Sequence, residues 1–531
     1  TFNIYGFNEI NSYSTKAEAV QIVQTPNDQI EGGYGYNANL TKGGTLNNLK
    51  EERIHGFGGF GGYNYDRRYI FDFSYRVDRT SLNGPNRGAQ KSPSFSARWN
   101  LHNEDFMRQF KGWLTTSSFK ASWGQTIKPN GSIFDVFGKY VFGQKFNNDP
   151  TYVIDFGTIP NMDFLPEANT TTSFSTEWGF FNNRLNAEYI YMYTTIDNLT
   201  LGVSLNNTNG FTRLTTVDAS LVKRNHLITL TARPIDVGRI RWTVSANGSI
   251  NRTILAKLPD GMREYVQSNF SDANQAVPVV MRLGRNQFSN LMYRTEGIYA
   301  NDTDVPVNPV TGLRKQFGNG QGLYFRAGDP IWTDINGDYI IDEKDLVPLG
   351  NPEPKYFGGI SSNLIFNDFT LNVNMQYFIG RDVINLASAQ NFQAYTNPLS
   401  ANAMLAINEY NYWKPLVQGD LSQGTAGAMY PNPFDFRRAG SLGSFRSNQT
   451  LFMENGSYWK LGDVTLLYNI PRALIAKYGM SSCRLSLSAY NLLVLTKYSG
   501  INPEQVSALG RDLSNGYPNA KQFSFGVNIQ F

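Results

Sequence analysis

The sequence is poor in cysteine, in charge and in long apolar runs. Its 531 residues include one cysteine, Cys483, so a framework of intramolecular disulfides is excluded. No stretch reaches the ~18 consecutive apolar residues of a membrane-spanning helix. The first residues, Thr1 to Tyr5, show neither the basic nor the apolar region of an export signal, and we expect any such signal to precede this chain.

Histidine is also scarce. The three histidines, His55, His102 and His226, lie far apart in the chain and match no zinc-ligand or nucleophile spacing. No local pair of carboxylates suggests glycoside hydrolysis. We therefore expect a protein that is not an enzyme and that needs no cofactor for catalysis.

Charged residues make up 17% of the chain, against roughly 25% in typical soluble proteins, and the formal net charge is +4. This small excess gives no electrostatic footprint for nucleic acid. Aromatic residues, by contrast, make up 14% of the chain. Abundant aromatics with sparse charge are typical of the interfacial girdles of membrane β-barrels, but they also fit a soluble β-sandwich or β-propeller.

The clearest structural signal is a period-two alternation of apolar and polar residues. It recurs over residues 69–78, 174–193, 242–251 and 369–377, and again at the end of the chain. About fourteen such segments, each near the ~9–11 residues that cross a bilayer at a tilt, predict an all-β transmembrane antiparallel β-barrel. The last segment has the apolar set Phe523, Phe525, Val527, Ile529 and Phe531.

Turn signals recur along the whole length without a linker rich in Ser, Gly or Pro, so we expect residues 1–531 to belong to one barrel domain. Tight turns should lie on one side of the membrane. Three long insertions, at about 126–171, 255–350 and 381–455, are expected as external loops on the other side. The first insertion is rich in aromatic residues, which either form a ligand surface or pack on one another; we favour the packing.

One stretch has metal-ligand spacing, "DINGDYIIDEKD" from Asp334 to Asp345. It places oxygen donors at the positions that bind Ca²⁺ in an EF-hand loop. Tyr339 stands where the sharp-turn glycine belongs, and an aspartate replaces the final glutamate, so a solvated acidic loop is the alternative. The candidate ligands are Asp334, Asn336, Asp338, the carbonyl of Ile340, Asp342 and Asp345.

Several longer stretches carry a family resemblance. They are "NYDRRYIFDFSYRVDRTS" from Asn64, "YRTEGIYAND" from Tyr293, "LGNPEPKYFGG" from Leu349, "SYWKLGDVTLLYNIPRALI" from Ser457 and "LSAYNLLVLTKYSGINPE" from Leu487. Together they resemble the C-terminal half of SusC-like TonB-dependent outer-membrane transporters of Bacteroidetes, a group that includes RagA. The resemblance runs from about residue 52 to the end of the chain.

The resemblance implies a 22-stranded barrel of which this chain is a C-terminal portion, since nothing here resembles the family's plug domain or TonB box. It also implies active import of an oligosaccharide or an oligopeptide across the outer membrane. The implied partners are a SusD-like surface lipoprotein acting as a lid, TonB, membrane lipid and the barrel assembly machinery. Phe531, with Phe523 and Phe525, resembles the aromatic terminal signal that this machinery recognises.

Two other functions stay open at this point. The barrel could be a structural or docking subunit of a larger outer-membrane complex in which transport has been lost, or it could be a passive porin. The sequence does not identify the substrate, and its substrate-binding residues are unknown. Nor does it decide the oligomeric state or the location of the plug.

Overall fold

The structure is a computed structural model, which describes residues 1–17, 48–147, 149, 151–259, 261–267, 277–318, 322–396, 407, 410–512 and 517–531. It divides into two compact units. Unit 1 comprises Thr1–Glu104, Phe119–Phe174 and Tyr193–Ser220, and unit 2 comprises Asp105–Ser118, Ser175–Met192 and Leu221–Phe531.

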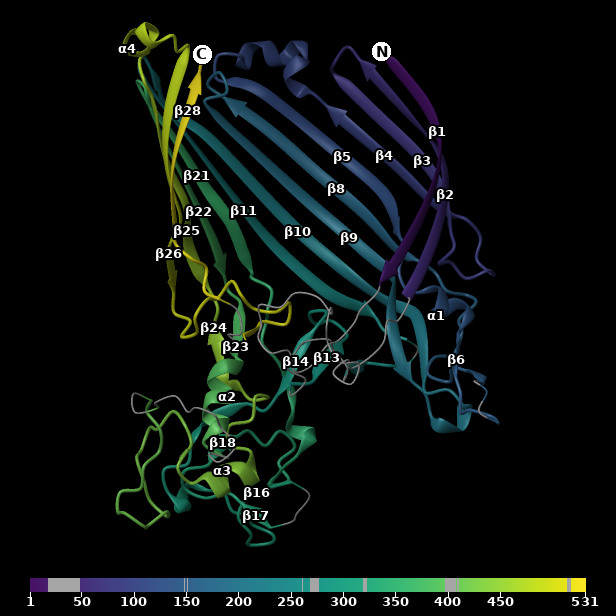
Figure 1. The fold of residues 1–531 in the computed structure, drawn as a ribbon, viewed down its shortest axis with the longest axis vertical. Helices are drawn as coiled ribbons and strands as arrows, with labels where there is room; N and C mark the ends of the chain where they lie inside the picture. The colour runs from purple at the N-terminus through teal and green to yellow at the C-terminus, as the bar shows by residue number, and fades with distance from the viewer. Residues whose placement is uncertain are drawn as a thin grey trace. The chain divides into compact units, whose positions relative to one another are not determined.

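Fourteen strands form the largest sheet, and they follow one another in chain order (Figure 1). This number agrees with the sequence prediction and confirms the all-β antiparallel class. The strands, in order, are β1 Phe2–Ala17, β2 Asn48–Tyr65, β3 Tyr69–Thr80, β4 Gln90–Trp99, β5 Leu114–Lys128, β8 Glu167–Phe180, β9 Leu185–Ser204, β10 Arg213–Val237, β11 Ile240–Lys257, β21 Tyr356–Phe366, β22 Phe369–Ile379, β25 Tyr458–Asn469, β26 Ser482–Thr496 and β28 Gln522–Gln530.

Short turns join many of these strands, and the backbone angles of the turn residues explain how the chain reverses. Between β2 and β3, Asp66 and Arg67 have φ of 48° and 55°. Two consecutive positive φ values match the type I′ turn, whose twist suits a tight hairpin. Asn367, at 51°, begins the two-residue turn between β21 and β22. From the sequence, the short polar stretches Asp66–Arg67 and Asn367–Asp368 beside alternating segments predict these two hairpins.

The strands present two chemically different faces. On β3, alternate side chains are exposed and aromatic, including Phe71 at 41% and Phe73 at 54% exposure. A row of neighbouring aromatic rings crosses β3, β4, β5 and β8 in unit 1, with centroids 6.2–6.5 Å apart, formed by Tyr69, Trp99, Phe119 and Phe174. An exposed apolar face with aromatic rows matches the lipid-facing side of an outer-membrane barrel.

The N-terminal strand is longer than the sequence indicated. From the sequence alone, the polar character and the Asn, Gly and Thr clusters of residues 1–50 predict only a weak strand or a loop. Instead β1 runs for 16 residues and pairs in unbroken register with β2, from Phe2 opposite Tyr63 to Ala17 opposite Asn48. Backbone pairing along a whole neighbouring strand outweighs the low β-propensity of these polar residues.

The insertion at 126–171 belongs to unit 1 and forms the short helix α1, Ile133–Phe137, and a hairpin of β6, Tyr140–Phe142, with β7, Tyr152–Ile154. Phe164 is fully buried in it, whereas Tyr140 and Tyr152 are 73% and 65% exposed. The ring of Phe164 lies against Gly131, where an added Cβ would stand 2.5 Å from it, and the favoured packing of the aromatics on one another stays a prediction. A two-stranded sheet leaves both of its faces open.

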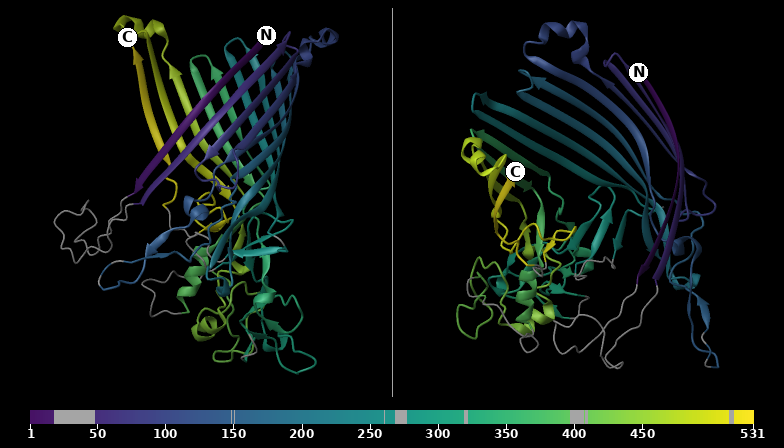
Figure 2. Two further views of the ribbon diagram at one scale, coloured as in Figure 1. Left: turned by 90° about the vertical axis from the view of Figure 1, so that its right-hand side faces the viewer. Right: turned by 45° about the horizontal axis from the view of Figure 1, so that its top comes forward.

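The described residues of the insertions of unit 2 fold into a body with its own core, which we call the loop body: 277–318, 322–349, 382–396, 407 and 410–455 (Figures 1 and 2). Its largest buried cluster includes Tyr293, Phe325, Trp332 and Leu442. Small sheets and helices make up the rest of the loop body and its borders. One sheet has the order β12 Glu264–Gln267, β13 Val279–Arg282, β14 Ser289–Met292 and β20 Val347–Leu349, and β15 Thr295–Ile298 pairs with β18 Pro330–Trp332. A third sheet comprises β16 Gln316–Phe317, β17 Leu323–Tyr324 and β19 Ile340–Ile341, and a fourth comprises β23 Asp382–Asn385, β24 Met453–Asn455 and β27 Arg511–Asp512. The two helices are α2 Leu386–Ala394 and α3 Phe436–Leu442. A further helix, α4, spans Arg472–Ile475 between β25 and β26.

Candidate functional site

The polar face of unit 1 is the side of its strands opposite the exposed aromatic residues. Hydroxyl groups meet across neighbouring strands on this face. The Oγ atoms of Ser74 and Ser94 lie 2.7 Å apart, and those of Ser122 and Ser173 lie 2.6 Å apart. A hydroxyl can both donate and accept a hydrogen bond, so these serine side chains can bind water or a polar solute either as donors or as acceptors. The sequence predicted this face from the alternation of residues 69–78.

A charged cluster lies on the same face. Arg76 donates from Nε to both carboxylate oxygens of Asp78, at 2.8 and 2.9 Å, and its Nη1 lies 3.0 Å from Oε2 of Glu9. The guanidinium carbon also sits 5.5 Å from the ring centre of Phe7. Three ionised groups and one aromatic ring, drawn from β1 and β3, thus form one patch with a net charge of −1.

The acidic loop is held by its own backbone amides. Asp334 accepts hydrogen bonds from Gly337 N at 2.7 Å and from Tyr339 N at 2.8 Å. The backbone reaches φ of 75° at Gly337 and 65° at Tyr339. This geometry explains how the loop turns without a glycine at position 339.

The end of this loop is closed by Asp345, which is fully buried. Its two oxygens accept from Ile335 N at 2.8 Å and from Asp342 N at 2.9 Å. Asn336 and Asp338 bond to each other, and Asp338 accepts from Ile340 N at 2.8 Å. The predicted residues therefore do come together in one loop, with backbone amides on several of their oxygens.

Within the part of the chain that the structure describes, no group of three or more His, Cys, Asp or Glu side chains is arranged to hold a metal ion. The donors of the acidic loop are instead spread along a turn. Each carboxylate oxygen has a second lone pair, so oxygen chemistry suited to Ca²⁺ is retained. Calcium binding stays a prediction.

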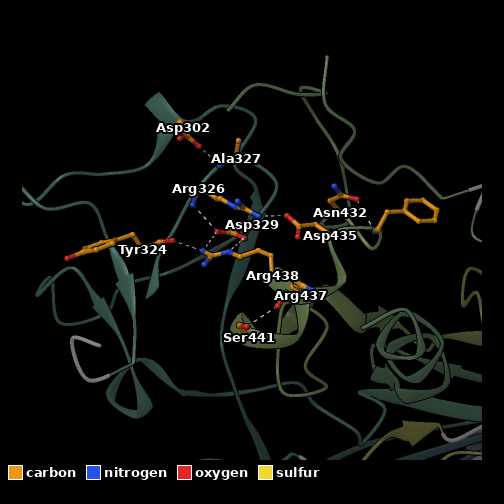
Figure 3. A network of polar contacts seen from close by, with 11 residues as sticks. Asp302, Tyr324, Arg326, Ala327, Asp329, Asn432, Asp435, Arg437, Arg438 and Ser441 are labelled. Carbon is orange, nitrogen blue, oxygen red and sulfur yellow. Dashed lines mark hydrogen bonds and ion pairs between the residues drawn. The ribbon is translucent and has the colours of Figure 1, made fainter. Parts of the chain in front are cut away.

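A network of ion pairs ties α3 to the segment before β18 in the loop body (Figure 3). Arg438 donates to Asp329 from Nε at 3.1 Å and from Nη2 at 2.5 Å, and it also donates to the carbonyl of Tyr324 at 2.5 Å. Arg326 pairs with Asp435. Burial raises the pKa of Asp329 above its ordinary value, although its hydrogen bonds with Arg438 oppose that shift.

A second buried cation lies among aromatic rings. The guanidinium carbon of Arg446 is 4.5 Å from the ring centre of Phe317, 4.9 Å from that of Trp332 and 5.1 Å from that of Tyr293. Burial lowers the pKa of Arg446. Its Nη2 donates to the carbonyl of Leu442 at 3.0 Å. No local sequence signal indicated either cluster, because their members come from segments far apart in the chain.

The residues of the terminal signal lie on and just beyond β28. Phe523 and Phe525 are 71% and 69% exposed, and Phe531 is 88% exposed. On its paired side, β28 lies against β26, with Phe525 opposite Leu487. The structure shows that these aromatic side chains are exposed at the end of the chain. Their role in assembly stays a prediction.

Two of the histidines make hydrogen bonds within their own unit. His55 makes a hydrogen bond of 2.8 Å with Asn8 in unit 1, and His226 makes one of 2.9 Å with Tyr189 in unit 2. Among the helices that the structure describes, none is both long and apolar enough to cross a membrane.

Comparisons with known proteins agree with the fold. No family model matches the chain. TonB-dependent receptor P3 of Formosa agariphila is 24% identical over 485 residues, covering 88% of this chain and 44% of the relative. TonB-dependent receptor SusC of Bacteroides thetaiotaomicron is 22% identical over 489 residues, covering 89% of this chain and 43% of that protein. Neither name denotes an enzyme.

A solved structure of the RagAB peptide importer in its open-open state matches 100% of this chain and 53% of its own chain, with a TM-score of 0.73 and 20% identity. That likeness establishes the fold, that of the antiparallel sheet of an outer-membrane β-barrel. The chain spans about half the length of the relatives it matches. The motif resemblance is thus confirmed: the chain is SusC-like over about 88% of its length and, like these TonB-dependent receptors, a protein of the bacterial outer membrane.

Proposed function

We propose that this chain forms barrel wall and external loops of a TonB-dependent importer that carries an oligomeric nutrient, an oligosaccharide or an oligopeptide, across the outer membrane. The observation that carries the proposal is the pairing of an aromatic, exposed face with a hydroxyl-lined polar face on the strands of one fourteen-stranded sheet. Similarity to TonB-dependent receptors over 88% of the chain supports it.

The loop body supports import over simple leakage. Described residues of 277–349 and 382–455 build a separate core with a buried ion pair, Arg438–Asp329, which simple leakage through a pore does not require. In this proposal a SusD-like surface lipoprotein closes over the external loops, and TonB acts through a region outside this chain. A folded loop body gives such a lid a fixed surface to contact.

The test uses the full-length protein in its own outer membrane. Cells receive a mixture of labelled hexasaccharides or of labelled hexapeptides, and periplasmic uptake is measured by mass spectrometry with and without a working TonB. We expect uptake of one class that disappears when TonB is removed. Uptake indifferent to TonB would indicate a passive porin. No uptake, together with co-purification in a multi-protein assembly, would indicate the docking subunit.

We also propose that the acidic loop, residues 334–345, is a structural Ca²⁺ site on the external side. The support is that Asp334, Asn336 and Asp338 supply oxygen atoms along one tight turn that Asp345 closes. Calcium would there stabilise the loop body and take no part in transport.

A further inference from the structure

The aromatic, outward face of β3 in unit 1 ends in a cation. Alternate side chains of β3 are exposed and aromatic as far as Tyr75, and Arg79 is the next exposed one. The other end of this face begins with a row of rings, because Tyr69 lies 6.4 Å from Tyr65 and 6.5 Å from Trp99 between ring centroids. Such rings are typical of the boundary between hydrocarbon and headgroups. One end of the face therefore carries rings and the other end carries charge.

Neighbouring strands add basic side chains at the same end. His55 of β2 is the cross-strand partner of Arg79, and Lys91 of β4 is the partner of Val77. Directly opposite residues share a face of the sheet and lie about 5 Å apart. Arg53 lies on this face too, because it is two residues from His55. We call the four exposed side chains Arg53, His55, Arg79 and Lys91 the basic patch.

The separation of the rings from the basic patch matches the thickness of a membrane. Arg79 lies ten residues beyond Tyr69 along β3. At about 3.4 Å per residue and a tilt of about 35–45°, this stretch rises roughly 24–28 Å along the membrane normal. The apolar band of an outer-membrane barrel is about 25 Å tall. With the rings at one boundary of the hydrocarbon, the basic patch lies at the other, level with the lipid headgroups.

The cations of the basic patch are not neutralised within the part of the chain that the structure describes. Arg53, Arg79 and Lys91 form no ion pair with a carboxylate there. Arg76, on the other face of β3, is by contrast paired with Asp78. Like charges close together on neighbouring strands destabilise a sheet, and an anion between them removes that cost. The patch therefore favours an anion supplied from outside the chain.

One carboxylate and one hydrogen bond limit the charge of the patch. Glu51 is exposed two residues before Arg53, so it lies on the same face of β2. The Nε2 atom of His55 lies 2.8 Å from Oδ1 of Asn8, which leaves Nδ1 of the ring for another partner. The three cations and Glu51 together have a net charge of +2.

The surroundings of the patch narrow the class of anion. Arginine binds phosphate through two parallel hydrogen bonds, and clusters of basic residues at a membrane surface attract anionic headgroups. Next to the patch on the same face lie exposed apolar side chains, among them Phe57 at 60% and Phe73 at 54% exposure. These side chains suit contact with acyl chains. A phosphate attached to acyl chains matches both parts of the surface, whereas a free phosphate would match only the cations.

We propose that the basic patch binds the phosphate groups of a lipid in the outer leaflet of the outer membrane, with Arg53, Arg79 and Lys91 on the phosphates and the apolar side chains around Phe57 against the acyl chains. Lipid A, the membrane anchor of lipopolysaccharide, has this chemistry. The orientation rests on the proposed function, in which the long insertions are external. The insertion at 126–171 leaves β5 at the end that holds the patch, because β4 and β5 pair antiparallel.

The test measures lipid binding to the purified full-length protein in a non-ionic detergent by native mass spectrometry. The probes are lipid A with two phosphate groups, the same lipid A after its phosphates are removed, and phosphatidylglycerol as an anionic lipid with one phosphate. We expect the phosphorylated lipid A to bind at least tenfold more tightly than either of the other two lipids. Arg79→Gln/Lys91→Gln should weaken that binding at least tenfold, because each basic residue near a membrane surface contributes about fivefold to the affinity for anionic lipid.

Two further variants separate recognition from misfolding. Arg67→Gln/Lys111→Gln is the matched control: it removes two exposed cations outside the patch, one of them in the turn at the other end of β2 and β3, and should change the affinity less than twofold. Arg79→Lys/Lys91→Arg keeps the charge and should bind within about threefold of the wild type.

The lipid site is refuted if lipid A without phosphates or phosphatidylglycerol binds as tightly as phosphorylated lipid A. It is also refuted if Arg79→Gln/Lys91→Gln binds like the wild type, or if Arg79→Lys/Lys91→Arg loses binding to the same extent as the glutamine variant. TonB-dependent uptake by the wild type together with any of these results refutes the lipid site alone and leaves the proposed function standing.

Discussion

Arg438 and Asp329 form a nearly enclosed bidentate ion pair, with side-chain exposures of 14% and 2%, although 109 residues separate them in the chain. The pair joins α3 to the segment that leads into β18. Removing one partner of a buried pair leaves an uncompensated charge, which typically costs about 3–5 kcal/mol. We therefore expect the loop body to be sensitive to the substitution of either partner.

Asp329→Ala should open the loop body around α3. The cost of about 3 kcal/mol or more corresponds to roughly a hundredfold larger population of the locally open state. Hydrogen exchange of residues 436–442, measured by mass spectrometry in detergent, should accelerate accordingly. The control is Arg314→Ala, which breaks the more exposed pair with Asp302 and should cost under ~1 kcal/mol. Equal exchange in the two variants would contradict the role assigned to the Arg438–Asp329 pair.

Lys315 gives a prediction with a defined pH dependence. It is buried, its Nζ donates to the carbonyl of Trp332 at 2.6 Å, and burial lowers its pKa. A base whose pKa is lower in the folded state than in the unfolded state destabilises the fold when it is charged. This loss of stability shrinks as the pH rises toward the ordinary pKa of lysine, because the side chain then loses its charge. Lys315→Met should therefore stabilise the loop body at neutral pH by about 1 kcal/mol, less at alkaline pH.

The measurement is local hydrogen exchange or limited proteolysis of the loop body at pH 7 and at pH 10. The advantage of Lys315→Met over the wild type should be largest at pH 7 and smaller at pH 10. Lys344→Met is the control, because that side chain is 71% exposed and should show no such difference. An advantage that grows with pH would show that burial does not penalise the charge of Lys315.

The part of this molecule that was predictable from sequence is the part governed by local periodicity. Alternation placed Asp72 and Arg76 on one face of β3, and paired turn residues such as Asp66 and Arg67 fixed the hairpins. The stacking of Trp332 on the guanidinium of Arg446 was not predictable. It depends on how irregular loops pack on one another, and no spacing of residues encodes that packing.

The same distinction applies to the candidate sites. The acidic loop is contiguous, so its residues were found together from spacing alone. A cavity on the polar face of unit 1, lined by Ser74, Arg76 and Gln125 among others, draws instead on four strands, β2, β3, β4 and β5. Knowing which strands are neighbours, and in which register, was necessary to see it.

The acidic loop is tested with metal alone. If it binds Ca²⁺, adding calcium after chelation should protect residues 334–345 from proteolysis in the wild type but not in Asp334→Asn. Asn at position 334 keeps the size of the side chain but removes a charge from the ligand set. Asp304→Asn, outside the loop, is the control and should behave as the wild type. Protection that is independent of calcium in all three proteins would establish a turn held by backbone amides only.

Phe531→Asp should impair insertion into the outer membrane more than it impairs transport by the molecules that do insert. Phe531 ends the chain just beyond β28, it is 88% exposed, and it continues the apolar row of Phe523 and Phe525. A charge on the lipid side of a strand costs about 2–4 kcal/mol near the bilayer midplane and less toward the interface, so the folded barrel should tolerate it at the strand end. The loss is therefore expected at recognition by the assembly machinery. Surface levels of Phe531→Asp, measured by protease shaving, should fall severalfold. Tyr517→Asp, a change at an exposed residue outside β28, is the control and should leave the surface level unchanged. Normal surface levels of Phe531→Asp would show that the terminal residue has no role in assembly.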